Sequence, residues 1–286
     1  MRDRPRSPRR RRERRSPTPA AAQKRAAIHK LKAALAEERL VLHYQPIVGA
    51  RDSRVVDVEA LLRWRSLRKE RARIEDLLRS AESSPVIFEL ENWALERAAQ
   101  EAHEWRRAGL PGVRVNVNLS AREFPRADLV GRVKRRLASA GLDPRGLVLE
   151  VTETSSIQDF DAVSDQIQRL IAMGIQLWLD DFGTGHSSLE WLSHLPLHGV
   201  KIAGTFVERL PTEKRCQVIV ARVIDLAHDF KLRVVAEGVE NEQQRDFLVR
   251  CGCDLLQGFL FHAAMPAKEL LRALAGPPTS SGTLRA

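Results

Sequence analysis

Short apolar runs rich in β-branched residues alternate with longer helical patterns from residue 40 onward, and this alternation restricts the fold more than any other feature. The runs from residue 113 onward are almost continuously apolar, as in strands that are covered on both faces. Strands are therefore expected at residues 40–45, 54–62, 113–119, 147–152, 175–180, 200–203, 232–237 and 255–261. Eight strands in a chain of 286 residues favour an α/β fold, a single TIM-like (β/α)8 barrel, over an open sheet.

The first two expected strands are joined only by residues 48–53, which are too few for a helical crossover. We therefore expect the first strand to be antiparallel to its neighbours. One more helix is expected over residues 23–38, before the barrel and packed on it. No internal repeat and no second domain are evident.

The net charge of +10 comes mostly from the N-terminal segment. Residues 1–25 contain eleven Lys or Arg and two Asp or Glu, whereas the other 261 residues contain 36 basic and 35 acidic side chains. We expect residues 1–25 to be a disordered Arg/Pro-rich tail, 26–275 to form the barrel domain and 276–286 to be a flexible C-terminal tail. No aromatic residues separate the arginines, so any nucleic-acid contact by the tail is expected to be nonspecific, and a solvated tail is the simpler interpretation.

The sequence also bears on the compartment. No stretch reaches the roughly 18 apolar residues that a membrane span needs, and the tail lacks the apolar region of a secretory signal. Cys216, Cys251 and Cys253 form neither an even disulfide set nor a paired zinc motif. We therefore expect reduced, buried thiols in a cytoplasmic protein.

Polar residues interrupt the apolar runs at or near their carboxyl ends, which surround one mouth in a barrel. These residues are Asn118, Glu150, Asp180, Asp181, Lys201, Glu237 and Gln257. Carboxylates in apolar surroundings repel one another unless a cation lies between them, and oxygen ligands without a His or Cys cluster favour Mg²⁺ or Mn²⁺ over Zn²⁺. Alone, each has a plainer explanation, such as an acidic turn at Asp180 or a salt bridge between Glu59 and Arg63. Their joint occurrence on successive strands favours a metal site.

Several short segments follow one another in an order and spacing typical of one family. They are Tyr44-Gln45-Pro46, Glu59-Ala60-Leu61-Leu62-Arg63-Trp64, Asn116-Val117-Asn118-Leu119-Ser120, Glu150-Val151-Thr152-Glu153, Asp180-Asp181-Phe182-Gly183-Thr184-Gly185, Val200-Lys201-Ile202, Val235-Ala236-Glu237-Gly238-Val239-Glu240 and Gln257-Gly258-Phe259. Through them, the chain from about residue 40 to 266 resembles the EAL-domain family, which is named after Glu-Ala-Leu. The resemblance implies a barrel with an antiparallel first strand and the hydrolysis of cyclic di-GMP to linear pGpG by a metal-activated water.

The resemblance also implies roles for individual residues. The matching metal ligands, for Mg²⁺ or Mn²⁺ and two ions in all, are Glu59, Asn118, Glu150, Asp180, Asp181 and Glu237. Among these, Glu59 and Glu237 also match catalytic positions, as does Lys201, which matches a lysine beside the attacking water. Gln45, Arg63 and Gln257 match substrate-binding positions, and Glu153 matches a loop-anchoring glutamate tied to metal binding and dimerisation. A homodimer, and regulation through that interface or a protein partner, are therefore expected.

The chain departs from the family pattern at several positions. Ala203 stands where the family has an aspartate, His186 stands where a tyrosine is common, and residues 66–85 replace a proline-containing stretch beside the substrate cleft. The segment at 262–264 lacks the usual basic residue and proline. Two hypotheses remain open: a phosphodiesterase whose activity is reduced by the loss at Ala203, and a degenerate EAL module that binds cyclic di-GMP or a protein partner without catalysis.

Overall fold

A computed structural model describes residues 19–65, 71–110, 112–126, 128–152, 160–184 and 188–275. Within these residues the strands form one closed sheet in the order β2-β3-β4-β5-β6-β7-β8-β1-β9, and β1 also pairs with β2. The strands are β1 (Leu40–Gly49), β2 (Val55–Trp64), β3 (Arg114–Leu119), β4 (Leu147–Thr152), β5 (Gln176–Phe182), β6 (Gly199–Ile202), β7 (Arg233–Ala236), β8 (Leu255–Leu256) and β9 (Met265–Pro266). The expected TIM-like barrel is confirmed.

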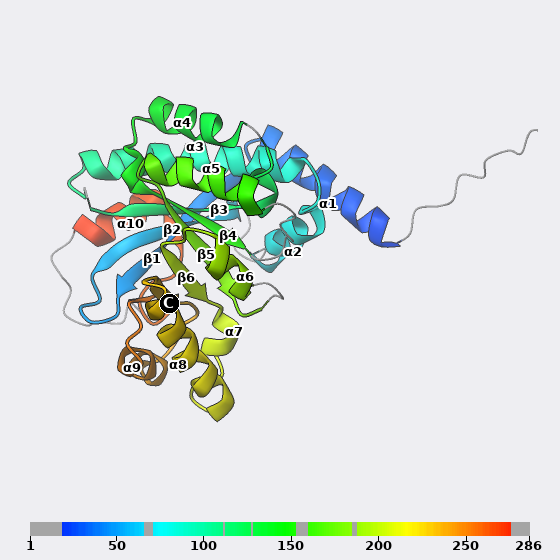
Figure 1. Ribbon diagram of the computed structural model, residues 1–286. Coiled ribbons are helices and arrows are strands. Elements are labelled where there is room, and N and C mark those ends of the chain that lie inside the picture. The colour runs from blue at the N-terminus through cyan, green and yellow to red at the C-terminus, as the bar shows by residue number, and fades with distance from the viewer. Residues whose placement is uncertain are drawn as a thin grey trace, which may run out of the picture.

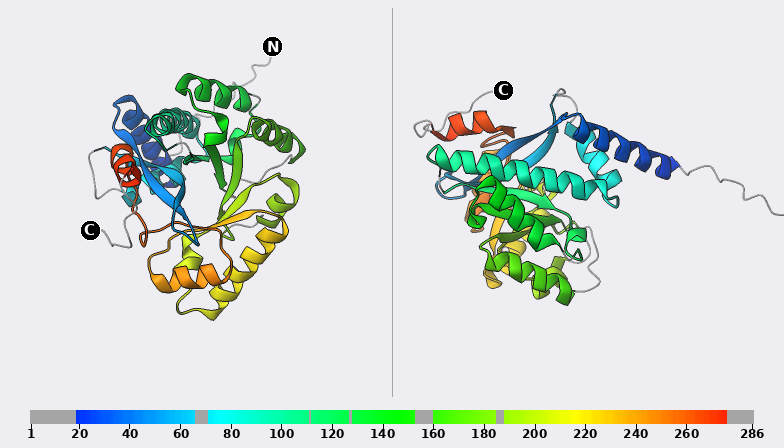
Figure 2. Two further views of the ribbon diagram at one scale, coloured as in Figure 1. Left: turned by 90° about the vertical axis from the view of Figure 1, so that its left-hand side faces the viewer. Right: turned by 90° about the horizontal axis from the view of Figure 1, so that it is seen from above.

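Helices surround the strands on the outside (Figure 1, Figure 2). The α-helices are α1 (Pro19–Ala36), α2 (Arg71–Ala81), α3 (Val86–Arg107), α4 (Leu129–Ala140), α5 (Phe160–Ala172), α6 (Ser188–His194), α7 (Gly204–Val207), α8 (Lys214–Asp229), α9 (Glu242–Arg250) and α10 (Ala267–Ala275). Two short 3₁₀ helices, η1 (Ala121–Glu123) and η2 (Pro144–Gly146), flank α4. The main core lies between the helices and the outer face of the barrel.

The first strand is antiparallel to both of its barrel neighbours, as expected. It pairs with β2 from Leu40–Trp64 to Val48–Val55, and with β8 through Val48–Leu256. The later strands pair in parallel, from β2–β3 to β7–β8. One antiparallel strand therefore closes an otherwise parallel barrel.

The last barrel strand is shorter than the expected 255–261, because the chain turns away after Leu256. Val239 donates its backbone N–H to the carbonyl of Gln257 at 3.0 Å, and its carbonyl accepts from Leu260 at 3.0 Å. A Cβ at Gly258 would lie 2.1 Å from the Val239 carbonyl oxygen, so only glycine fits this approach. The short β9, which pairs with β1, was not expected either.

An apolar layer fills the barrel interior below its carboxyl-end mouth. It is formed by Ile47, Val148, Trp178, Val235 and Leu255, all at most 1% exposed. Gly199 makes room for the indole of Trp178, since a Cβ there would lie 2.6 Å from the ring. This layer is the floor on which the polar side chains of the mouth stand.

The N-terminal boundary of the ordered part differs from the expectation. We expected disorder through Arg25, yet α1 begins at Pro19. Proline suits the first turn of a helix and alanine is the strongest helix former, so the run that begins at Pro19 favours an earlier start. Residues 1–18 and 276–286 lie outside the described residues, so the expected tails remain predictions there. No helix among the described residues has the length and hydropathy of a membrane span.

Candidate active site

The polar side chains at the mouth lie above the apolar floor, one inward-facing position further along each strand. Side chains two residues apart on a strand point to the same face. Val148, Trp178, Val235 and Leu255 of the floor are thus followed by Glu150, Asp180, Glu237 and Gln257, and on the reversed β1 Ile47 is preceded by Gln45. Alternation along the strands therefore brings residues far apart in the sequence into one ring.

Lys201 lies at the centre of this ring and is fully buried. Its Nζ is 2.6 Å from Glu237 Oε1, 2.9 Å from Glu150 Oε2, 3.1 Å from Glu59 Oε2 and 3.5 Å from Asp180 Oδ1. A buried ammonium needs such partners to offset its lost hydration. Four of the expected site carboxylates therefore meet around one lysine.

Amide side chains fix two of these carboxylates. Gln257 donates to Glu59 Oε2 at 2.7 Å, and Asn118 donates to Glu59 Oε1 at 3.2 Å. Asn116, which was not predicted as a site residue, donates to Glu150 Oε1 at 2.7 Å. The sequence did indicate Asn116 as a site residue, because Asn116 and Asn118 are two residues apart on β3 and share one face.

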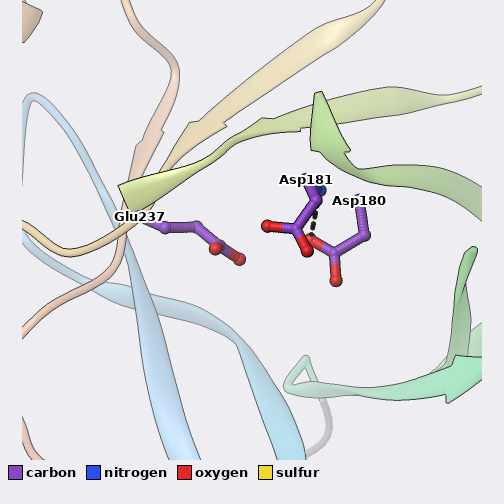
Figure 3. A group of neighbouring side chains, drawn as sticks. All are labelled: Asp180, Asp181 and Glu237. Carbon is purple, nitrogen blue, oxygen red and sulfur yellow. Dashed lines mark hydrogen bonds between the residues drawn. The ribbon is translucent and has the colours of Figure 1, made fainter. Parts of the chain in front are cut away.

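Asp180, Asp181 and Glu237 form a group that could hold a metal ion (Figure 3). Each offers a carboxylate oxygen, and these oxygens lie within 4.8 Å of one another. Consecutive strand residues normally point to opposite faces, but Asp181 has a φ of 53° and the β5–β6 register shifts between Leu179 and Phe182. This irregularity lets both aspartates face the mouth. The Asp181 N–H donates to Asp180 Oδ1 at 2.9 Å.

The ring holds more carboxylates than Lys201 can neutralise. Burial raises the pKa of Glu150 to about 8 and that of Glu237 well above its ordinary value, despite the attraction of Lys201. For Glu59, Lys201 and the amide donors outweigh burial and lower the pKa. Burial opposes the charge of Lys201, but Asp180, Glu150, Glu237 and Glu59 raise its pKa. The donor set is oxygen-only and has more carboxyl groups than one ammonium can keep ionised, which fits a hard divalent cation.

A cavity of about 490 Å³, here called the acidic pocket, opens above the ring. Its polar and charged lining residues are Gln45, Glu59, Arg63, Glu75, Arg79, Asp180, Asp181, Glu237, Glu240 and Gln257. Gln45 and Arg63 thus lie where substrate-binding residues were expected. Gln45 is held in place, because its Nε2 donates to the His262 carbonyl at 3.1 Å. Glu75 and Arg79 of α2 were missed, because the segment 66–85 matched no pattern.

A second, mostly apolar cavity of about 360 Å³ shares Leu61, Arg63, Glu75 and Arg79 with the acidic pocket. Glu91 of α3 lies at its wall and accepts the Ser120 N–H at 2.7 Å through Oε1. Its Oε2 is buried and lacks a hydrogen-bond partner among the described residues. Burial raises the pKa of Glu91 to about 8.

Three expected or divergent positions remain to be placed. Ala203 is buried at the start of α7, two residues beyond Lys201, and its methyl group offers no ligand to the mouth. Glu153, the expected loop anchor, and His186 both lie outside the described residues. Their roles therefore stay predictions.

Known proteins resemble this chain in sequence. It is 40% identical over 248 residues to the bifunctional diguanylate cyclase/cyclic di-GMP phosphodiesterase MucR of Pseudomonas aeruginosa, a match that covers 87% of this chain and 36% of MucR. It is 39% identical over 257 residues to the cyclic di-GMP phosphodiesterase NbdA of the same species, covering 88% of this chain and 33% of NbdA. The chain thus spans about a third of the length of these curated relatives.

Solved structures show the same architecture. The phosphodiesterase PaMucR in complex with c-di-GMP superposes with a TM-score of 0.77 at 38% identity, over 86% of this chain and 99% of that one. The EAL domain of DcpA from Mycobacterium smegmatis gives a TM-score of 0.71 at 33% identity, over 83% and 96% of the two chains. The EAL domain family model matches residues 28–264. With most of its length matched, this chain belongs to the EAL domain family.

Proposed function

We propose that this chain is a metal-dependent phosphodiesterase that hydrolyses one phosphodiester bond of cyclic di-GMP and releases linear pGpG. The observation that carries the proposal is the ring of Glu59, Glu150, Asp180 and Glu237 around Lys201 at the barrel mouth. The ring occupies the positions that the EAL resemblance assigns to the chemistry. Relatives named as cyclic di-GMP phosphodiesterases support the choice of substrate.

The site has the residues that such a reaction needs. Glu59, Asn118, Glu150, Asp180, Asp181 and Glu237 would hold Mg²⁺ or Mn²⁺, two ions in all if the EAL resemblance extends to the second site. When bound, these ions supply Lewis acidity, which makes water a stronger nucleophile at neutral pH and offsets charge on the phosphate. The proposal rests on oxygen donors because a His or Cys cluster, which Zn²⁺ prefers, is absent from the described part of the mouth.

The chain's own side chains position the reacting groups. Lys201 holds the carboxylates of Glu59, Glu150 and Glu237 in one place and keeps a positive charge beside the water that attacks. Gln257 fixes Glu59, and Gln45 lines the pocket next to it. Arg63 presents a planar guanidinium, whose paired N–H groups match the oxygens of a phosphate. The apolar floor keeps bulk water away from the underside of the ring.

The proposal is tested by incubating the purified chain with cyclic di-GMP and Mn²⁺ or Mg²⁺ and separating the nucleotides by chromatography. We expect pGpG to form, to require the metal and to disappear in Glu59→Ala. Lys214→Met, on the exposed side of α8, is the matched control and should leave the rate unchanged. No pGpG from the wild-type chain with either metal would refute the proposal.

The residue type at position 203 should determine whether the phosphodiesterase activity is full or reduced. An aspartate there would lie two residues beyond Lys201, between the end of β6 and the start of α7, and would offer a further carboxylate close to the mouth. We expect Ala203→Asp to bind Mn²⁺ more tightly and to turn over cyclic di-GMP severalfold faster than wild type. Turnover in Ala203→Asp but not in wild type would mean that the natural chain is a binding module.

A homodimer remains a prediction, which light scattering on the purified chain would check.

A further inference from the structure

The helix α2 brings a second guanidinium group to the acidic pocket. Among the described residues that line the pocket, the basic side chains are Arg63 from β2 and Arg79 from α2. Arg79 also lines the neighbouring apolar cavity, so it lies on the wall between the two spaces. Arg79 is therefore part of the electrostatic surroundings of the site.

Among the residues that the structure describes, Arg79 is held only by a weak contact. It forms an ion pair with Asp76 on the same helix, with Nη1 3.4 Å from Oδ1, and the two side chains are 76% and 68% exposed. Exposed pairs of this kind contribute little to stability, so the contact with Asp76 does not explain a guanidinium at this position. A long, exposed side chain that is held so weakly can turn toward a ligand.

The proposed substrate has a matching feature. A cyclic dinucleotide carries two phosphodiester groups on opposite sides of its macrocycle. Only one of them can lie beside the carboxylates around Lys201 during hydrolysis. The other then lies toward the pocket wall and keeps its negative charge. Glu240 of the lining would repel an anion there, so a cation on that wall favours binding of the second phosphate.

We propose that Arg79 binds the phosphodiester group of the substrate that is not cleaved. The inference rests on the proposed function and adds a residue of this chain's divergent segment 66–85 to the substrate site. Arg79 contributes to affinity for a dinucleotide and takes no part in the attack on the scissile phosphate. Its removal therefore raises KM and leaves kcat almost unchanged.

The test compares Arg79→Ala with Arg222→Ala. Arg222 forms a similar exposed pair with Asp225 on α8, at 2.9 Å, and lines neither the acidic pocket nor the apolar cavity. For cyclic di-GMP we expect Arg79→Ala to raise KM about tenfold and to change kcat less than about twofold, the size of one charge-assisted contact. Bis(p-nitrophenyl) phosphate has a single phosphate, so its hydrolysis should respond equally little in both variants. Arg79→Lys should retain part of the affinity, because it keeps the charge but not the fork.

Binding without turnover provides an independent readout. In EDTA, the Kd of cyclic di-GMP measured by equilibrium dialysis should rise about tenfold in Arg79→Ala and stay unchanged in Arg222→Ala. If Arg79→Ala has the same Kd and KM for cyclic di-GMP as Arg222→Ala, the role of Arg79 is overturned. The same holds if Arg79→Ala loses as much activity on bis(p-nitrophenyl) phosphate as on cyclic di-GMP. If the wild-type chain binds cyclic di-GMP but does not cleave it, the proposed function fails, while the Kd comparison still decides the role of Arg79.

Discussion

Lys201 carries one positive charge in contact with four carboxylates, all drawn from different strands or their ends. Such a cluster is stable only while its charges are paired, because the floor beneath it is apolar. The pKa of Glu150 rises to about 8 even so. Lys201 is therefore both a catalytic candidate and the counter-ion on which the metal-free site depends.

Replacing this lysine should destabilise the metal-free protein. We expect Lys201→Met to lower the free energy of unfolding by about 3 kcal/mol in EDTA, because the carboxylates lose their cation. The loss should be smaller at low pH, where the carboxylates take up protons. Urea titrations with EDTA and with Mn²⁺ measure both effects, with Lys214→Met as the exposed control. A metal-free Lys201→Met as stable as wild type at neutral pH would contradict this account.

The residues of the ring were predictable because polar side chains at the ends of apolar strands stand out from their surroundings. Asn118 and Lys201 lie at the mouth, as the strand pattern predicted, and Glu59 lies there as the EAL resemblance predicted. Arg79 was not predictable, since an arginine on an amphipathic helix looks the same whether it faces solvent or a pocket. Only the packing of α2 beside the mouth distinguishes the two.

Among the elements, strand bounds followed from the sequence where hydrophobic runs end at turns, as for β4 at Leu147–Thr152. They did not follow for β8, because residues 257–261 continue the apolar pattern while the backbone turns to bond Val239. The irregular β5, with Asp181 at positive φ, is equally hidden in an apolar run. An apolar run therefore does not fix regular strand structure: Phe259 of the first segment is 53% exposed, and Asp181 of the second is exposed as well.

The contact between α3 and β3 depends on Glu91, which accepts the Ser120 N–H at the end of β3. Burial raises its pKa from 4.5 to about 8 in the folded chain, with Glu123 adding to the increase and Arg132 opposing it. Between these values the folded state holds a proton that the unfolded state has lost. Stability from this group is therefore full at low pH and falls as pH rises through the window up to about 8.

Glu91→Gln removes this titration and keeps a carbonyl oxygen for Ser120. From about pH 5 to about pH 9 we expect wild type to lose about 4 kcal/mol more of its unfolding free energy than the variant. Urea titrations across that range measure the difference, with Glu104→Gln on the exposed side of α3 as a control. Parallel pH profiles for wild type and Glu91→Gln would show that Glu91 ionises as freely in the fold as outside it.

At the scale of the whole molecule, a second hydrophobic cluster joins α1, α2 and α3 at one edge of the barrel (Figure 1). Ala27, Leu31 and Ala34 of α1 are at most 1% exposed and pack in the same cluster as Ile74 of α2. The barrel and a preceding helix packed on it follow from the sequence, but the partners of that helix in α2 and α3 do not, because α1 precedes the repeating units. It links the N-terminal helix to the helix that carries Arg79.

This link predicts how truncation should act. Removing residues 1–18 should change neither stability nor KM, because α1 and its contacts remain. Removing residues 1–36 exposes the cluster and should cost roughly 4 kcal/mol of unfolding free energy. It should also raise the KM for cyclic di-GMP, because α2 loses a packing partner.

Leu31→Ala, which leaves the chain length intact, should lower the free energy of unfolding by about 2–5 kcal/mol in urea titrations and raise the KM as well. If the chain that starts at residue 37 unfolds at the wild-type urea concentration, α1 is an appendage and α2 is held by the barrel alone.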